Sequence, residues 1–211
     1  MSRKVRQYVY ADEQGRPRFR KVRSDPKRMP VETWKPTLKG RGGWVPKLRD
    51  EQLEFSEKAM YHLQELIWAL RANEPVYWCE GEKDADALRG VGTFATSHWQ
   101  GASDVHPSQA RWFAEFGTTS RVYIVVDVDY PGFHCGRLRY DALRRVGVEP
   151  SRLRIIKPPR PHNDAAEAIE AGLRLRDFRR VSLSRLRAAS DRYVAAGRAR
   201  SRSYTRQSAA S

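Results

Sequence analysis

The central part of the chain alternates short apolar runs with helical patterns, and this alternation restricts the fold more than any other feature. Runs rich in β-forming residues are expected as strands at 76–79, 93–96, 122–126 and 154–156, and helices are expected at 84–89, 107–116, 133–146 and 164–171. Because strands and helices alternate, we expect right-handed crossovers around a mostly parallel sheet. The fold class is therefore predicted as α/β, with helices flanking the sheet.

Acidic residues follow three of these runs at the point where each expected strand ends. Glu80 and Asp84 follow the first run, Asp127 and Asp129 follow the third, and Asp164 follows the fourth after a Pro-rich link. The carboxyl ends of parallel strands share one edge of a sheet, and ligands gather just beyond that edge. We therefore expect these carboxylates to lie together.

Carboxylate clusters of this kind suit hard cations such as Mg²⁺, which binds one or two carboxylates together with substrate phosphate. The ion offsets charge on a phosphoryl group and can orient an attacking oxygen. Gly81 allows a tight turn that exposes Glu80, and the turn at 130–132 lets Asp127 and Asp129 face one ion. The pattern predicts a magnesium-dependent site for phosphate chemistry.

Net charge is divided unevenly along the 211 residues, which carry a formal charge of +15. Residues 1–50 have a net charge of +10, residues 51–173 of −4 and residues 174–211 of +9. Two basic terminal segments around an acidic centre are suited to binding phosphate groups next to a cation site. Nucleic acid is therefore the leading candidate partner. Basic tails that only aid solubility are the alternative. Candidate contacts are Arg41, Arg179, Arg180, Arg185 and Arg187.

Four segments are expected from these patterns. Residues 1–50 form a basic hairpin region whose segments 24–27 and 39–44 have the Pro and Gly density of irregular loops. Residues 51–74 form one connecting helix, residues 75–173 the catalytic α/β domain, and residues 174–211 an amphipathic Arg-rich helix followed by a flexible tail.

The cysteine and hydropathy patterns exclude several classes. Two cysteines build neither a disulfide framework nor a four-ligand zinc site, so no zinc is expected. No apolar run approaches the ~20 residues that cross a bilayer, so we expect no membrane association. A cytoplasmic protein is predicted, associated with the nucleoid or, if phage-encoded, in the host cytoplasm.

The acidic motifs resemble the TOPRIM domain, the catalytic module of bacterial and phage-type primases, topoisomerases and some nucleases. The resemblance covers about residues 75–172 and is carried by E-G-E-K-D at 80–84, D-V-D-Y-P-G at 127–132 and N-D-A-A-E at 163–167. The segment at 96–102 resembles the loop that follows the second strand in primase-type members. The hairpin at 8–20 resembles the one that precedes this core in phage and mobile-element primases.

The resemblance implies roles for individual residues and for cofactors. Glu80 would act in proton transfer, and Asp127 and Asp129 would carry Mg²⁺ or Mn²⁺. Asp84 and Asp164 would be supporting acids, and Asp164 and Glu80 would also belong to the metal site. Lys83 would meet a phosphate, although a surface salt bridge explains it equally well. Template or single-stranded DNA and nucleotides are the implied partners.

Three functions remain open at this point. A primase-like nucleotidyltransferase acting in replication is favoured, a metal-dependent nuclease on the same scaffold is second, and a non-catalytic DNA-binding protein is third. No zinc-binding pattern precedes residue 62, and no P-loop motif occurs. A separate partner protein is therefore expected to supply a helicase or a zinc-binding module.

Overall fold

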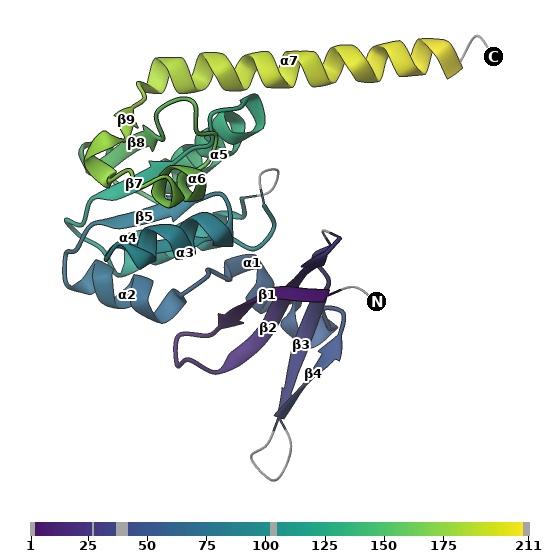
Figure 1. Ribbon diagram of the computed structural model, residues 1–211, viewed down its shortest axis with the longest axis vertical. Coiled ribbons are helices and arrows are strands. Elements are labelled where there is room, and N and C mark those ends of the chain that lie inside the picture. The colour runs from purple at the N-terminus through teal and green to yellow at the C-terminus, as the bar shows by residue number, and fades with distance from the viewer. Residues whose placement is uncertain (1–2, 27, 37–41, 102–104, 209–211) are drawn as a thin grey trace.

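The computed structural model describes residues 3–26, 28–36, 42–101 and 105–208, with only the backbone described for 3–5 and 200–208. It contains a four-stranded antiparallel sheet of order β1-β2-β3-β4 and a five-stranded sheet of order β6-β5-β7-β8-β9. The smaller sheet packs beneath the helices and strands of the larger layered unit, and the last helix crosses the opposite end (Figure 1).

The N-terminal sheet consists of β1 (Arg3–Ala11), β2 (Pro17–Asp25), β3 (Val31–Pro36) and β4 (Gly42–Pro46). The β1–β2 hairpin confirms the prediction from sequence. The expectation of an irregular loop at 39–44 was wrong for residues 42–44, which lie in β4. Trp44 pairs directly with Trp34 on β3, with ring centroids 5.0 Å apart, and Trp34 also covers Gly42. This cross-strand aromatic contact outweighs the weak strand preference of the glycines.

The larger sheet has the predicted α/β architecture. Its strands are β5 (Val76–Cys79), β6 (Phe94–Ser97), β7 (Val122–Val125) and β8 (Leu153–Lys157), which run parallel, and β9 (Arg179–Arg180), which is antiparallel. The crossover helices are α3 (Glu82–Gly90), α4 (Pro107–Glu115), α5 (Tyr130–Arg145) and α6 (Ala165–Glu170). Alternate strand residues face opposite layers: Trp78 and Ile124 pack in the core with α4 and α5, whereas Cys79 and Val125 pack with α3 and α6.

The single helix expected at 51–74 is instead two short helices, α1 (Leu53–Lys58) and α2 (Leu63–Arg71). Between them His62 has a left-handed backbone, with φ of 56°. The Tyr61 amide donates to the carbonyl of Ser97 at 2.8 Å, and Met60 forms a bridge with His98. The chain leaves the helical conformation here because its backbone hydrogen bonds go to the end of β6.

The last helix, α7 (Leu183–Ser208), begins as the predicted amphipathic helix. Its first turns pack on α5, and Leu186 is fully buried in the core. In place of the expected flexible tail, the helix continues up to Ser208 and extends past the rest of the molecule (Figure 1). Alanine and arginine, which favour helices, recur in this part and proline does not occur. In the part of the chain described here, no helix is long and apolar enough to cross a membrane.

Candidate functional site

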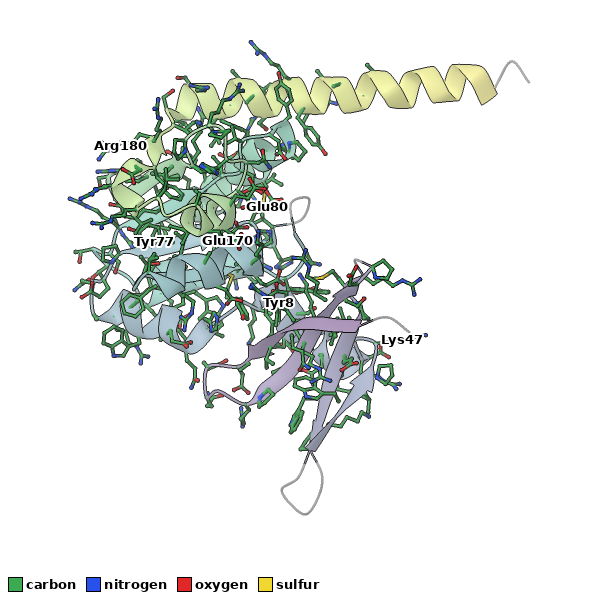
Figure 2. The ribbon with its side chains drawn as sticks, viewed as in Figure 1. Tyr8, Lys47, Tyr77, Glu80, Glu170 and Arg180 are labelled. Carbon is green, nitrogen blue, oxygen red and sulfur yellow. The ribbon has the colours of Figure 1, made fainter. Side chains whose placement is uncertain are left out.

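The candidate site lies where the order of strands reverses. From β5 the chain moves to β6 on one side and then returns to β7 on the other side of β5. Parallel α/β sheets bind ligands at such a point, beyond the carboxyl ends of the strands. Glu80 follows β5 directly and Asp127 follows β7 after one intervening residue. Figure 2 shows Glu80 beyond the end of β5.

Glu80 has a buried carboxylate oxygen without a protein partner. Its Oε2 is inaccessible to solvent and accepts no hydrogen bond from the residues that the structure describes. Burial raises the pKa of Glu80, nearby Arg139 lowers it and the carboxylate of Asp129 raises it further. Buried carboxylate oxygens are normally satisfied, so an unpaired one marks a place for a cation or a proton.

Asp127 is a buried aspartate with other carboxylates nearby. Burial, followed by the charges of Asp84 and Glu80, raises its pKa to about 9. The turn after it requires glycine at position 132, because a Cβ there would lie 2.7 Å from the Cβ of Asp127. The glycine of the D-x-D-x-x-G pattern therefore lets the chain turn tightly over the aspartate.

Asp129 is the N-cap residue of α5, and Asp164 is the N-cap residue of α6. Asp129 Oδ1 accepts a hydrogen bond of 2.7 Å from the Gly132 amide at the start of α5. Asp164 Oδ1 accepts one of 2.7 Å from the Glu167 amide at the start of α6. Capping fixes both carboxylates at helix N-termini, where the helix dipole favours negative charge.

Asp84 connects the first acidic motif to the third. It is 7% exposed, and its Oδ1 accepts a hydrogen bond of 3.0 Å from the Ala166 amide in the first turn of α6. Burial raises the pKa of Asp84 to about 6, although this hydrogen bond lowers it. Lys83 Nζ lies 4.0 Å from Asp164 Oδ2 and 3.8 Å from Glu170 Oε1. The structure therefore gives Lys83 carboxylate neighbours.

Arg139 is a site residue that the sequence analysis missed. It lies on α5, is fully buried, and donates to the carbonyl of Trp78 and, at 3.0 Å, to that of Val125. These carbonyls lie near the carboxyl ends of β5 and β7. The guanidinium lowers the pKa of both Glu80 and Asp127. With 40 Lys and Arg in the chain, the sequence carries no signal that distinguishes this arginine.

Glu82 attaches the N-terminal sheet to the site and was also missed. Its side chain is 6% exposed, and its Oε1 accepts a hydrogen bond of 2.6 Å from the Tyr10 hydroxyl and lies 2.7 Å from Lys21 Nζ. Tyr10 is on β1 and Lys21 on β2. The start of α3, two residues after Glu80, is therefore fixed against the smaller sheet.

The loop after β6 is held by a buried histidine. His98 Nδ1 accepts a hydrogen bond from Trp78 Nε1 at 3.2 Å, which leaves Nε2 to donate to the Gly101 carbonyl at 2.7 Å. Burial lowers the pKa of His98 to about 3, so the ring is neutral. Its observed contacts are structural.

The predicted nucleic-acid contacts lie mostly at the far edge of the sheet. Arg179 and Arg180 form β9 and are exposed, and Arg185 and Arg187 are exposed on α7. Arg185 shares a pocket with Asp129, whereas Arg187 is not among the residues that line it. Arg41 lies outside the described residues. Contact of these arginines with nucleic acid stays a prediction.

The donor set fits a hard divalent cation. The carboxylates of Glu80, Asp84, Asp127, Asp129 and Asp164 supply only oxygen. Burial, followed by the charges of neighbouring carboxylates, raises the pKa values of Glu80, Asp84 and Asp127. Among the described residues, no three Asp, Glu, His or Cys side chains are gathered closely enough to hold an ion as they stand.

The fold, a parallel-rich α/β sheet flanked by helices and preceded by a small antiparallel sheet, is of the kind found in primase catalytic domains. No family model and no curated protein matches the chain. The comparison of this chain with known proteins therefore rests on solved structures.

Three of the similar structures illustrate this class. A structure of the bacteriophage T7 lagging-strand DNA polymerase interacting with gp4 primase domains bound to an RNA/DNA hybrid and dTTP contains a chain 18% identical, with a TM-score of 0.51 over 79% of this chain and 70% of that one. The DnaG primase catalytic domain bound to single-stranded DNA is 14% identical, with a TM-score of 0.57 over 80% and 49%. The RNA polymerase domain of Mycobacterium tuberculosis DnaG is 15% identical, with a TM-score of 0.56 over 92% and 63%. The chain thus spans about half to two thirds of the DnaG chains.

Proposed function

We propose that this protein is a primase-like enzyme that carries out metal-dependent nucleotidyl transfer on a DNA template in replication. The observation that supports this most strongly is the set of five carboxylates at the strand reversal of a primase-type fold, with a buried, unpaired oxygen on Glu80 and a pKa of about 9 at Asp127. A site that gathers this much like charge gains stability when a cation binds.

In the proposed site, Asp127, Asp129 and Asp164 would hold Mg²⁺ or Mn²⁺, with Glu80 and Asp84 beside them. When bound, the ion would offset negative charge on the phosphoryl group that is transferred. Glu80 would accept the proton of the attacking hydroxyl, because its raised pKa brings it closer to neutral pH, where a general base is most effective. The positive charge of Arg139 would limit the rise in the pKa of Glu80.

The partners and organisation are proposed in the same terms. Primase structures with this fold contain single-stranded DNA, an RNA/DNA hybrid and dTTP, which supports template DNA and nucleotides as partners here. Residues 75–173 would be the catalytic domain, and residues 1–50, 51–74 and 174–211 its basic N-terminal sheet, connection and basic C-terminal helix. A separate helicase or zinc-bearing partner and a cytoplasmic location belong to the same proposal.

An assay that scores synthesis and cleavage together tests the proposal. The purified protein is incubated with Mg²⁺ or Mn²⁺, single-stranded DNA and labelled ribonucleotides and deoxyribonucleotides, with Glu80→Gln in parallel. Short new products that depend on Glu80 are expected, with a loss of at least ~100-fold in the variant, the usual scale of a general base. Glu80-dependent shortening of the DNA would replace the proposal by the nuclease alternative. Bound but unchanged DNA would favour a non-catalytic role.

A further inference from the structure

A groove of about 490 Å³ lies on the side of the molecule formed by the β1–β2 turn, α1 and α4. Lys58 and Arg111 line it, and neither forms an ion pair of 4.0 Å or less among the described residues. Its walls also carry four exposed glutamates: Glu13, Glu54, Glu57 and Glu115. The groove is therefore acidic on a chain whose formal charge is +15.

The glutamates of this groove are nearly all without cationic partners. Within the described part of the chain, Glu13, Glu54 and Glu115 form no ion pair of 4.0 Å or less. Glu57 has one such contact, with His106 Nε2 at 3.9 Å. Like charges that line one groove repel each other, so a cationic ligand would lower the energy of the groove.

Aromatic rings in the groove make arginine a better ligand than lysine. Trp112 and Phe116 line the groove and stack with their ring centroids 5.7 Å apart. The guanidinium of Arg71 already lies over the ring of Phe116, 4.7 Å from its centroid. Trp112 Nε1 donates to the carbonyl of Lys58 at 2.7 Å, which fixes α4 against the end of α1. Guanidinium groups both pair with carboxylates and stack on aromatic rings, so the groove suits an arginine-rich segment.

The chain itself contains such a segment in the second half of α7, residues 196–208. After Asp191 the sequence has five arginines and no acidic residue. Positions 198, 202 and 206 are spaced by four and so share one face of the helix. This part of α7 extends past the rest of the molecule (Figure 1). Helices without tertiary contacts are marginal in water, so a partner surface would stabilise this half of α7.

The second half of α7 is not placed to reach the groove of its own chain. The helix crosses the end of the molecule opposite to the N-terminal sheet, whereas the groove includes the β1–β2 turn of that sheet (Figure 1). It also continues without a break from Leu183 to Ser208 and so does not fold back. The groove of a second copy is open to it. Because the two surfaces differ, each pair of copies keeps one free helix and one free groove, and chains of copies can grow.

We propose that the second half of α7 in one copy binds the acidic groove of a second copy through its arginines. Both copies are positively charged, but at ~0.15 M salt the Debye length is about 8 Å, so distant repulsion is screened more than contacts inside the groove. The same arginines cannot pair with glutamates and with phosphates at once, so bound nucleic acid would separate the copies. The inference goes beyond the proposed reaction and does not depend on it.

Sedimentation analysis of the complete 211-residue chain, treated with nuclease and held at ~0.15 M salt, measures this association. The groove variant is Glu54→Lys/Glu57→Lys and the helix variant is Arg198→Glu/Arg202→Glu. We expect the Kd of self-association to rise at least ~10-fold in each, because attraction between the two surfaces becomes repulsion.

Mixing the two variants gives the sharpest result. An equimolar mixture of the groove variant and the helix variant should associate again, because every acidic surface then meets a basic one. Glu74→Lys/Glu149→Lys reverses two exposed acids outside the groove and is the matched control. The Kd of its self-association should change less than ~2-fold.

Four results would overturn the inference. The complete chain could stay monomeric at every concentration, or the control could weaken association as much as the groove variant, which would show a general effect of charge. A mixture that stays monomeric would show that the groove and the helix do not meet. Association that is present only before nuclease treatment would show that nucleic acid joins the copies.

A second groove variant keeps the test decisive if α1 does not tolerate lysine. Glu13→Lys/Glu115→Lys reverses charges on the β1–β2 turn and on α4 and should weaken association in the same way. Thermal unfolding checks that the variants fold, which is expected because the replaced glutamates are exposed. The measurement contains neither template nor nucleotide, so its failure and the failure of the proposed reaction are separate outcomes.

Discussion

At Asp127, burial and the charges of neighbouring carboxylates together have an energetic cost that can be measured. Its pKa rises from 3.8 to about 9, so the folded protein binds a proton there over a range of pH in which the unfolded chain does not. A group whose pKa is higher in the folded state contributes stability that declines as pH rises toward the folded value. The free energy of unfolding should therefore fall as the pH approaches 9.

Asp127→Asn should flatten this pH dependence, because asparagine keeps the shape of the neutral acid and cannot ionise. Urea unfolding at pH 6.5 and 8.5 measures the difference, and we expect the wild-type protein to lose more stability across that interval than the variant. Asp50→Asn, an exposed acid outside the site, serves as the control and should behave as the wild type. Identical pH dependence in all three proteins would mean that the pKa of Asp127 is not raised in the folded protein.

Arg139 supports the site through the backbone. Arg139→Met would leave the carbonyls of Trp78 and Val125 without their donor and remove the positive charge beneath Glu80. We expect a loss of about 3 to 5 kcal/mol in the free energy of unfolding, the range for breaking a buried charged contact. Arg145→Met on the same helix removes an exposed arginine and should stay within about 0.5 kcal/mol. Denaturant unfolding of both variants compares them, and equal losses would contradict the account.

At the scale of elements, the sequence pattern located the strands and helices that build the site. Periodicity and the acidic motifs placed Glu80 and Asp127 correctly at the carboxyl ends of β5 and β7, because parallel strands share that edge. The break between α1 and α2 was missed because the pairing of residues 60 and 61 with the end of β6 is a contact between distant segments. Arg139 could not be chosen among 40 basic residues without knowledge of its burial.

Glu82 tests how firmly the N-terminal sheet is attached to the core. Glu82→Ala removes the acceptor of Tyr10 and the partner of Lys21, so we expect a loss of about 3 to 5 kcal/mol in stability. Hydrogen exchange should speed up in β1 and β2 more than in β5 and β7. Glu51→Ala, which removes an exposed partner of Lys35 at 3.6 Å, should cost about 1 kcal/mol or less. Uniform exchange in all four strands would show that Glu82 does not join the two parts.

At the scale of the whole molecule, the basic helix α7 both closes the core and extends beyond it. Leu186 and Val181 are buried, so removal of residues 174–211 would remove part of the core together with the charge. A truncation that keeps residues 1–196 separates these effects. It deletes four arginines from the part of α7 that extends past the core (Figure 1).

This truncation should weaken binding to single-stranded DNA and reduce its salt dependence while leaving thermal unfolding nearly unchanged. On a single strand, the slope of log K against log salt falls by about 0.7 for each phosphate that the protein no longer neutralises. Fluorescence anisotropy with a labelled oligonucleotide at several salt concentrations measures it. An unchanged slope would show that residues 197–211 do not touch the phosphate backbone.

The central claim, that the carboxylates at the ends of β5 and β7 bind a divalent cation, is tested most directly by calorimetric titration with Mn²⁺. Carboxylates that hold a metal must give up their protons, so binding near pH 7 should release protons from the cluster, Asp127 above all. Repeating the titration in two buffers of different ionisation enthalpy measures that release. We predict saturable binding with proton release in the wild-type protein and loss of both in Asp127→Asn. Equal Mn²⁺ binding by Asp127→Asn and the wild type, without proton release, would contradict the account.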